Sequence, residues 1–266
     1  MAGERKDTWS AGDLYEPYVG RWSRLVARDF LAWLEVGPQR NWLDVGCGTG
    51  ALAESIFRQA RPRRLQCVDL SGAFIAHAKA RVGDVGATFA VADAQALPLN
   101  TARFDAAVSA LVLNFVPRPE RAVAEMARTV RSGGIIAAYV WDYAEKMELI
   151  RYFWDAAAAL DPAAAALDEG VRFPLCQPAA LLDLFRTAGL THAEARCIDI
   201  PTRFQNFEDY WFPFLGGQGP APGYAMSLSE DRRAALRERI RAALPIAADG
   251  SIDLSARAWA VRGRVS

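Results

Sequence analysis

Short apolar runs alternate with helical patterns between residues 42 and 141, and this alternation constrains the fold more than any other feature of the chain. Five runs have the length and the apolar content of buried strands, and they cover residues 42–45, 65–68, 87–91, 104–111 and 135–141. Helical periodicity follows several of them, at residues 51–60, 73–82 and 119–130. Because strands that alternate with helices at this spacing form parallel sheets covered on both faces, the sequence predicts an α/β fold.

The flanking segments follow other patterns. An apolar stripe at helical spacing predicts a helix over residues 14–35, and the alanine-rich stretch 146–188 is also expected to be helical. Residues 190–200 and 252–263 have the pattern of two further strands. The insert 203–245 between these strands begins with crowded aromatic residues and ends with an arginine-rich helix.

Composition excludes several classes of function. Lysine plus arginine and aspartate plus glutamate each total 31, so no net charge draws the chain to nucleic acid or to an anionic membrane surface. With two histidines and no C-x-x-C pair, we expect no metal site. The polar start MAGERKDTWSAGD lacks the apolar core of a signal peptide, and no apolar run approaches the ~18 residues of a membrane span. We therefore expect a cytoplasmic protein with reduced thiols.

The strongest local motif is the glycine-rich loop LDVGCGTG at residues 43–50, which follows a predicted strand and opens a predicted helix. Glycines in this context let the backbone approach a ligand closely, because they carry no Cβ. Residues 46–51 also fit the dinucleotide pattern G-x-G-x-x-A, so the loop alone leaves an NAD(P)-dependent oxidoreductase open. Asp44 argues against that alternative, because a carboxylate beside the ligand repels a pyrophosphate and suits an ammonium or a sulfonium.

Two more carboxylates end predicted strands. Asp69 ends the second strand, 19 residues after Gly50, where a carboxylate can accept both hydroxyls of a ribose. Its alternative role is a turn with Ser71. Asp93 ends the third strand, where it can bind the exocyclic amine of an adenine or simply close a turn.

Five segments in this order, LDVGCGTG, CVDLS, ADAQALPL, FDAAVSALVLNFV and VRSGGIIAAYVW, resemble the class I S-adenosylmethionine-dependent methyltransferases. Within that family the chain is most similar to the small-molecule branch that includes the ubiquinone/menaquinone C-methyltransferases. The resemblance is tight over about residues 40–142. It implies a Rossmann-like, seven-stranded, mostly parallel sheet with helices on both faces and an antiparallel last strand.

The resemblance also implies the cofactor, S-adenosyl-L-methionine, and the residues that hold it. By this resemblance, the glycine loop lies under the methionine part of the cofactor, and Asp44, the acid before the loop, orders the amino group. Asp69, at the end of the second strand, is implied to bind the ribose, and Asp93, at the end of the third, to bind the adenine amine. Residues beside them are implied to line the pocket. The implied cofactor residues are Asp44, Gly46, Cys47, Gly48, Gly50, Asp69, Leu70, Asp93, Ala94 and Leu111.

Three positions depart from the family pattern. Ser132 stands where proline usually precedes the glycine turn at residues 133–134, and Gln95 stands where an acid is common. Asn114 stands where many members carry histidine, which weakens the case for a general base there.

Methyl transfer from an activated sulfonium needs alignment and a dry pocket more than it needs a base. We therefore assign no catalytic residue. His77 and His192 are expected to be packing or surface residues. Asp142 directly follows the fifth strand, and active sites of parallel sheets lie beyond the carboxyl ends of the strands, although a solvated loop acid is an equal alternative.

The N-terminal helix and the aromatic insert are candidates for a cap. Tyr18 and Arg21 are expected to contact the cofactor, through the sulfonium and the carboxylate respectively, unless this helix only packs on the core. Residues 204–226, with a glycine- and proline-rich hinge at 216–223, are expected to enclose a small apolar or aromatic acceptor, unless these aromatics only bury the helices at 146–188. The expected acceptor contacts are Asn114, Trp141, Asp142, Tyr210, Trp211 and Phe214.

The sequence thus predicts one methyltransferase domain over all 266 residues that methylates a small acceptor. The alternatives are a cofactor-binding protein of the same fold with altered or lost chemistry and, less favoured, an NAD(P)-dependent oxidoreductase. The predicted parts are an N-terminal lid at 1–40, a cofactor-binding core at 41–142, a helical segment at 143–189 and C-terminal strands at 190–266 with the cap insert at 203–245.

Overall fold

The computed structural model describes residues 16–83, 86–217 and 219–266, which cluster into two compact units. Unit 1 contains the described residues of Met1–Arg21, Asp142–Phe173 and Ile200–Ala256. Unit 2 contains those of Trp22–Trp141, Pro174–Asp199 and Arg257–Ser266. The predicted single-domain organisation, with its cofactor-binding core at 41–142, stays a prediction.

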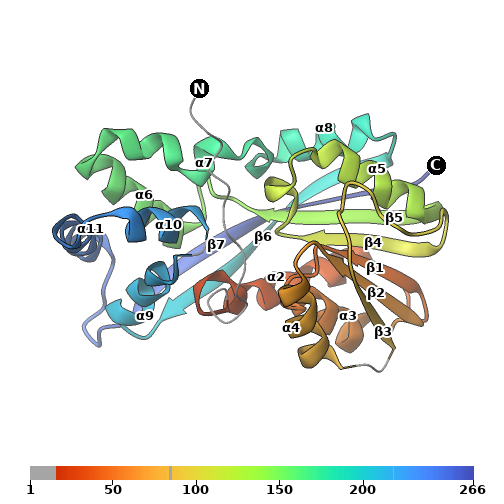
Figure 1. The fold of residues 1–266 in the computed structure, drawn as a ribbon, viewed down its shortest axis with the longest axis horizontal. Coiled ribbons are helices and arrows are strands. Elements are labelled where there is room, and N and C mark those ends of the chain that lie inside the picture. Colours follow the sequence, from red (N-terminus) through yellow and green to blue (C-terminus); the bar gives the residue numbers. More distant parts are fainter. Residues whose placement is uncertain (1–15, 84–85, 218) are drawn as a thin grey trace. The chain divides into compact units, whose positions relative to one another are not determined.

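In the described residues, seven strands form one sheet in the order β3-β2-β1-β4-β5-β7-β6 (Figure 1). Strand β7 pairs antiparallel with β5, whereas the pairs among β1 to β5 are parallel, so the predicted topology is confirmed. The strands are β1 (Asn41–Val45), β2 (Arg64–Asp69), β3 (Ala87–Val91), β4 (Phe104–Ala110), β5 (Val130–Trp141), β6 (Thr191–Phe204) and β7 (Ile252–Arg264).

Strands β5 and β6 extend several residues beyond their predicted ranges. Strand β5 begins at Val130, and the turn expected at 132–134 lies inside it. The reason is a pairing with the C-terminus, since the Gly133 N–H donates to the Val265 carbonyl oxygen at 2.8 Å and the Val265 N–H donates to the Gly134 carbonyl oxygen at 3.1 Å. Strand β6 continues to Phe204, so the predicted insert starts within a strand.

Helices cover both faces of the sheet in unit 2. Figure 1 shows α5 and α8 on one side of the strands and α3 and α4 on the other. Leu43 and Val45 of β1 pack in one core cluster with Met126 of α5 and Phe185 of α8. Because side chains alternate along a strand, Asp44 points to the opposite face. The elements are α2 (Arg21–Leu34, whose first residue belongs to unit 1), α3 (Ala51–Ala60), α4 (Gly72–Val82), η2 (Leu113–Phe115), α5 (Pro119–Thr129), η4 (Pro174–Cys176) and α8 (Pro178–Thr187).

Unit 1 has a core of stacked aromatic rings. Phe153 lies against Phe214, with ring centroids 4.6 Å apart and an angle of 15° between the rings, and it meets Trp154 and Tyr224 edge-on. The helices around this core are η1 (Glu16–Gly20), α6 (Glu148–Leu160), η3 (Pro162–Leu167), α7 (Glu169–Arg172), α9 (Phe207–Trp211), η5 (Phe212–Gly216), α10 (Pro220–Ser227) and α11 (Glu230–Ala243).

Two helix predictions need correction. The helix predicted over 14–35 is a π-helix, η1, followed by α2, and residues 14 and 15 lie outside the described residues. The predicted hinge at 216–223 contains the start of helix α10, because Pro220 occupies the first turn, where a missing N–H breaks no helical hydrogen bond. Within the described chain, no helix combines the length and the apolar character that crossing a bilayer requires.

Candidate functional site

The loops that follow β1, β2, β3 and β4 in unit 2 leave the same edge of the parallel sheet, where ligands of such sheets bind. The glycine loop folds over the end of β2, because the N–H groups of Gly46 and Cys47 both donate to the Val68 carbonyl oxygen, at 2.8 and 3.0 Å. This pair of bonds fixes the loop to the neighbouring strand before the chain enters α3.

The three glycines of the loop have positive φ angles but different surroundings. A Cβ on Gly46 (φ 74°) would lie 2.4 Å from Cγ2 of Val112, and one on Gly50 (φ 87°) would lie 3.2 Å from Cα of Ala78. A Cβ on Gly48 (φ 51°) would have no non-neighbouring atom of the described residues within 4 Å. Packing therefore requires glycine at 46 and favours it at 50, whereas position 48 borders open space that a ligand can occupy.

Asp44 is the least satisfied polar group of this edge. Its side chain is fully buried, and neither carboxylate oxygen has a hydrogen-bond partner among the described residues. Burial, followed by the charge of Asp69, raises the pKa of Asp44 to about 8. A buried carboxyl without a donor is costly, and a cation beside it removes the cost. The site therefore fits the ammonium group of the methionine part of the cofactor that the resemblance implies.

Asp69 holds the loop and the next helix together. Its Oδ2 accepts a hydrogen bond from the Gly48 N–H at 2.9 Å, and its Oδ1 accepts one from the Ser71 N–H at 2.8 Å. The alternative turn role is thus present. Burial raises the pKa of Asp69, and these backbone bonds offset part of the effect. These backbone bonds do not use all the lone pairs of the carboxylate, so the role in binding ribose stays a prediction.

The residues predicted to surround the adenine differ in exposure. Asp93 is exposed, and its Oδ1 accepts hydrogen bonds from the Gln95 backbone N–H at 2.8 Å and from Nε2 of Gln95 at 3.1 Å, which close a turn. Leu70 is 73% exposed, so its side chain is available to a flat base. Ala94 and Leu111 are half-buried. Their contacts with a cofactor remain predictions.

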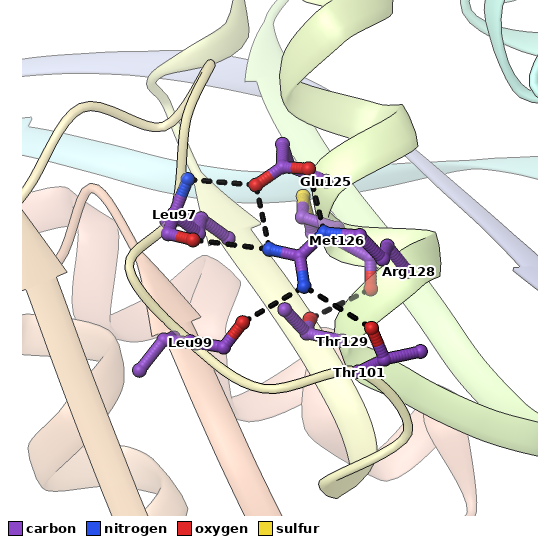
Figure 2. Close-up of polar contacts among 7 residues, drawn as sticks. All are labelled: Leu97, Leu99, Thr101, Glu125, Met126, Arg128 and Thr129. Carbon is purple, nitrogen blue, oxygen red and sulfur yellow. Dashed lines mark hydrogen bonds and ion pairs between the residues drawn. The ribbon is translucent and has the colours of Figure 1, made fainter.

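The segment after Asp93 is tied to α5 by one arginine (Figure 2). Arg128 donates to the carbonyl oxygens of Leu97 and Leu99, at 3.0 and 2.8 Å, and pairs with Glu125 at 2.7 Å. Glu125 in turn accepts from the Leu97 N–H at 2.7 Å, and the bond to Arg128 lowers the pKa of Glu125. This network anchors the chain that follows the predicted adenine contact.

Other predicted residues of unit 2 present unused polar atoms. Nδ2 of Asn114 donates to Sγ of Cys176 at 3.5 Å, while its Oδ1 has no partner within the described residues. Nε1 of Trp141 is buried and has no partner in the same set of residues. Cys47 is buried, and a hydrogen bond with Cys67, together with burial, raises the pKa of its thiol, so it contributes its backbone rather than a thiolate.

The two N-terminal predictions fall in unit 1. Arg21 pairs with Asp209 at 2.8 Å and lies over the ring of Phe204, 4.7 Å from its centroid. The cation expected to meet the cofactor carboxylate is therefore engaged by an acid of the same unit. Tyr18 is buried and meets the ring of Phe214 edge-on.

The aromatic insert packs on α6. The Tyr210 hydroxyl donates to the Leu149 carbonyl oxygen at 2.7 Å, and Trp211 is only 4% exposed. Phe212 is instead the exposed aromatic of this segment. Asp142 is buried, and its Oδ1 accepts from the Glu145 N–H at 3.0 Å in a turn directly after β5. Acceptor contacts by these residues remain predictions.

Two adjacent buried acids, Asp168 and Glu169, escaped sequence reasoning. Glu169 begins α7 in unit 1 and is 2% exposed, and burial raises its pKa to about 7. No motif marks it, and the only signal is the acidic pair Asp168-Glu169 at the end of an alanine-rich stretch.

Comparisons with known proteins agree with this geometry. A family model described as a methyltransferase domain matches residues 43–138. A ubiquinone/menaquinone biosynthesis C-methyltransferase of Methylobacterium nodulans is 30% identical over 172 residues, which cover 59% of this chain and 68% of that protein. A malonyl-[acyl-carrier protein] O-methyltransferase of Hahella chejuensis is 35% identical over 109 residues, 41% of this chain and 39% of that one, so the match spans less than half of that relative. The fold is shared with phosphoethanolamine N-methyltransferase 2 of Haemonchus contortus, solved with S-adenosylhomocysteine, at a TM-score of 0.60 and 15% identity over 96% of this chain and 57% of that one.

Proposed function

Because this chain belongs to the family of S-adenosylmethionine-dependent methyltransferases, we propose that it transfers a methyl group from S-adenosyl-L-methionine to a small organic acceptor with an apolar or aromatic body. The observation that carries the proposal is the carboxyl of Asp44, which is buried without a partner in the described chain, next to a glycine loop that leaves open space at Gly48. Both features suit a ligand with an ammonium group.

The cofactor supplies a methyl group that is already activated on a sulfonium. Three carboxylates would bind and orient it. Asp44 would hold the ammonium group, Asp69 would accept the ribose hydroxyls through its remaining lone pairs, and Asp93 would accept the adenine amine. The glycine loop would bring its backbone against the methionine part, since a side chain at Gly48 would fill that space.

The family match over residues 43–138 does not by itself identify the acceptor. The three comparison proteins are named for C-, O- and N-methylation, so membership of the family is compatible with each kind of acceptor atom. The buried polar atoms of Asn114 and Trp141 in unit 2, which have no partner among the described residues, would suit a polar group carried by such an acceptor.

The proposal is tested with S-adenosylmethionine carrying a tritiated methyl group and a panel of phenols, quinols, amines and carboxylic acids. We expect label to pass to at least one acceptor in the presence of the wild-type chain and to pass much more slowly with Asp44→Asn at the same low cofactor concentration. Binding of the cofactor without transfer to any acceptor would favour the alternative of a protein with altered chemistry. Absence of cofactor binding would overturn the proposal altogether.

A further inference from the structure

The segment between β3 and β4 carries Asp93, the expected adenine contact, but has no regular structure of its own. Residues 92–103 join the two strands and contain neither a helix nor a strand. Parallel strands of one sheet are usually connected through a helix, which packs on the sheet and holds the connection in place. The place of Asp93 therefore depends on the contacts of individual residues.

The start of this segment and its first turn are held by short-range hydrogen bonds. The Ala92 N–H donates to the Asp69 carbonyl oxygen at 2.9 Å, which fixes the residue before Asp93 to the end of β2. The Ala96 N–H donates to the Asp93 carbonyl oxygen at 3.0 Å, and the Gln95 N–H donates to Oδ1 of Asp93 at 2.8 Å. These bonds set the shape of the turn, and the residues that follow must hold its far end.

Helix α5 holds that far end through the backbone of Leu97 (Figure 2). The Leu97 N–H donates to Oε2 of Glu125 at 2.7 Å, and its carbonyl oxygen accepts from Nη2 of Arg128 at 3.0 Å. Leu97 is buried in the same core as Met126 of α5, so its backbone groups have lost water and need these partners. The residue that directly follows the turn is therefore fixed by two side chains of one helix.

The guanidinium of Arg128 makes five hydrogen bonds, as many as it has N–H groups. Nε and Nη2 bind the two carboxylate oxygens of Glu125, both at 2.7 Å. Besides its bond to Leu97, the group reaches the Leu99 carbonyl oxygen at 2.8 Å and Oγ1 of Thr101 at 3.4 Å. A lysine carries three donors on one nitrogen, so it cannot replace the whole set. Arg128 thus joins three points of the segment to α5.

We propose that Arg128 is a positioning residue for the adenine end of the cofactor site and that it sets the selectivity for a purine with an exocyclic amine. This inference rests on the methyl-transfer function proposed above and on Asp93 as the acid that accepts the adenine amine. Arg128 acts through the backbone of residues 97–99, which holds the turn that carries Asp93. Without that anchor, Asp93 occupies several positions and meets the amine only part of the time.

The test compares S-adenosylhomocysteine with S-inosylhomocysteine, which has a carbonyl oxygen in place of the amine, by calorimetric titration into the full chain. We expect the wild type to prefer S-adenosylhomocysteine by at least about tenfold, the effect of one hydrogen bond to a charged acceptor. Arg128→Met should lower this ratio to about threefold or less. Arg131→Met is the matched control, because Arg131 pairs with Asp105 at 2.6 Å at the opposite ends of the strands, and it should leave the ratio unchanged.

Two further variants keep the test decisive. Arg128→Lys keeps the charge and the aliphatic stem, so it tests the anchor even if Arg128→Met does not fold, and it should also lower the ratio. Asp93→Ala should lower the ratio directly, and adding Arg128→Met to it should change the ratio no further, because both substitutions remove the same contact. Independent effects of the two substitutions on the ratio would contradict a role of Arg128 through Asp93.

Hydrogen exchange separates positioning from a general loss of stability. In Arg128→Met or Arg128→Lys, the backbone amides of residues 92–103 should exchange faster under native conditions, while those of β1 and β4 stay slow. Equal acceleration across the whole of unit 2, with an unchanged ratio, would show that Arg128 is a structural residue only.

The possible failures are distinguishable. If S-adenosylhomocysteine does not bind the wild-type chain, the proposed function fails, and this inference fails with it. If it binds but the wild type shows no preference over S-inosylhomocysteine, or if Asp93→Ala keeps the preference, the adenine lies elsewhere and the role of Arg128 is overturned. A wild-type ratio in the folded Arg128→Met or Arg128→Lys protein would overturn it as well.

Discussion

Replacing Asp44 with asparagine should change how the stability of the ligand-free protein depends on pH. The wild-type carboxyl is fully buried, and its pKa is raised from 3.8 to about 8, chiefly by burial. Between about pH 4 and about pH 8, the folded protein keeps a proton that the unfolded chain has released, so the free energy of unfolding falls as pH rises through this window. Each unit of pKa corresponds to about 1.4 kcal/mol. The loss reaches about 4 kcal/mol at pH 7 and approaches about 6 kcal/mol above pH 8.

Asp44→Asn keeps the shape of the side chain and removes this titration. We expect the free energy of unfolding of the variant, measured with urea across the same pH window, to lack the fall assigned to Asp44. At pH 7 the variant should be more stable than the wild type by roughly 2–4 kcal/mol, because the buried amide keeps a desolvation cost of its own. Parallel pH profiles for the two proteins would refute the assignment of a strained carboxyl at this position.

Asp44→Asn should also weaken the binding of S-adenosylhomocysteine. An ammonium beside Asp44 favours the ionised carboxylate, so binding of S-adenosylhomocysteine at pH 7 should release close to one proton from the wild type and almost none from the variant. The heat of binding in buffers of different ionisation enthalpy measures this release. Asp44→Asn should also lose roughly 1.5–3 kcal/mol of binding free energy, the range for hydrogen bonds to a charged group. Equal affinities and equal proton release would place the ammonium elsewhere.

Three further substitutions test the site and the core by calorimetry with S-adenosylhomocysteine and by urea unfolding. Asp69→Ala should weaken binding by about 1.5–3 kcal/mol, and full affinity in a folded variant would show that it is not the ribose acid. Gly48→Val should abolish binding, at a stability cost of only about 1–2 kcal/mol for its left-handed φ. Gly46→Ala should destabilise the fold more, because its Cβ would lie 2.4 Å from Val112. If Gly48→Val were instead the more destabilising variant, the assignment of open space at position 48 would be contradicted. Trp211→Ala removes a ring that is 4% exposed, so it should cost about 3–5 kcal/mol of stability and leave the affinity of the folded protein for S-adenosylhomocysteine unchanged. A stability loss well under that range would argue for a contact with the acceptor rather than for packing.

The sheet could be predicted because its determinants are local. Each buried strand of unit 2 is an apolar run bounded by a turn or a helix, and the antiparallel last strand followed from the family resemblance. The end of β7 and the start of β5 could not be read locally, because Val265 and Gly133 come together only when the sheet forms. The helix start at Pro220 was missed because proline signals both a hinge and a first helical turn.

In the candidate site, too, the residues of a local motif could be predicted from the sequence, whereas pairs brought together only by the fold could not. Gly46 and Asp44 stand in a contiguous motif, so their placement at the end of β1 could be predicted from the sequence, whereas their roles in binding stay predictions. The pair of Arg21 with Asp209 joins residues 188 positions apart, and no sequence pattern links them. Glu169 follows an alanine-rich stretch and belongs to no motif, and only the fold buries it and brings Trp154 to it.

The most direct measurement of the central claim is a calorimetric titration of the full chain with S-adenosylhomocysteine and, separately, with NAD. We expect one saturable site for S-adenosylhomocysteine, with proton release at pH 7, and no binding of NAD. Saturable binding of NAD without binding of S-adenosylhomocysteine would contradict the assignment of the Asp44 edge to a sulfonium cofactor.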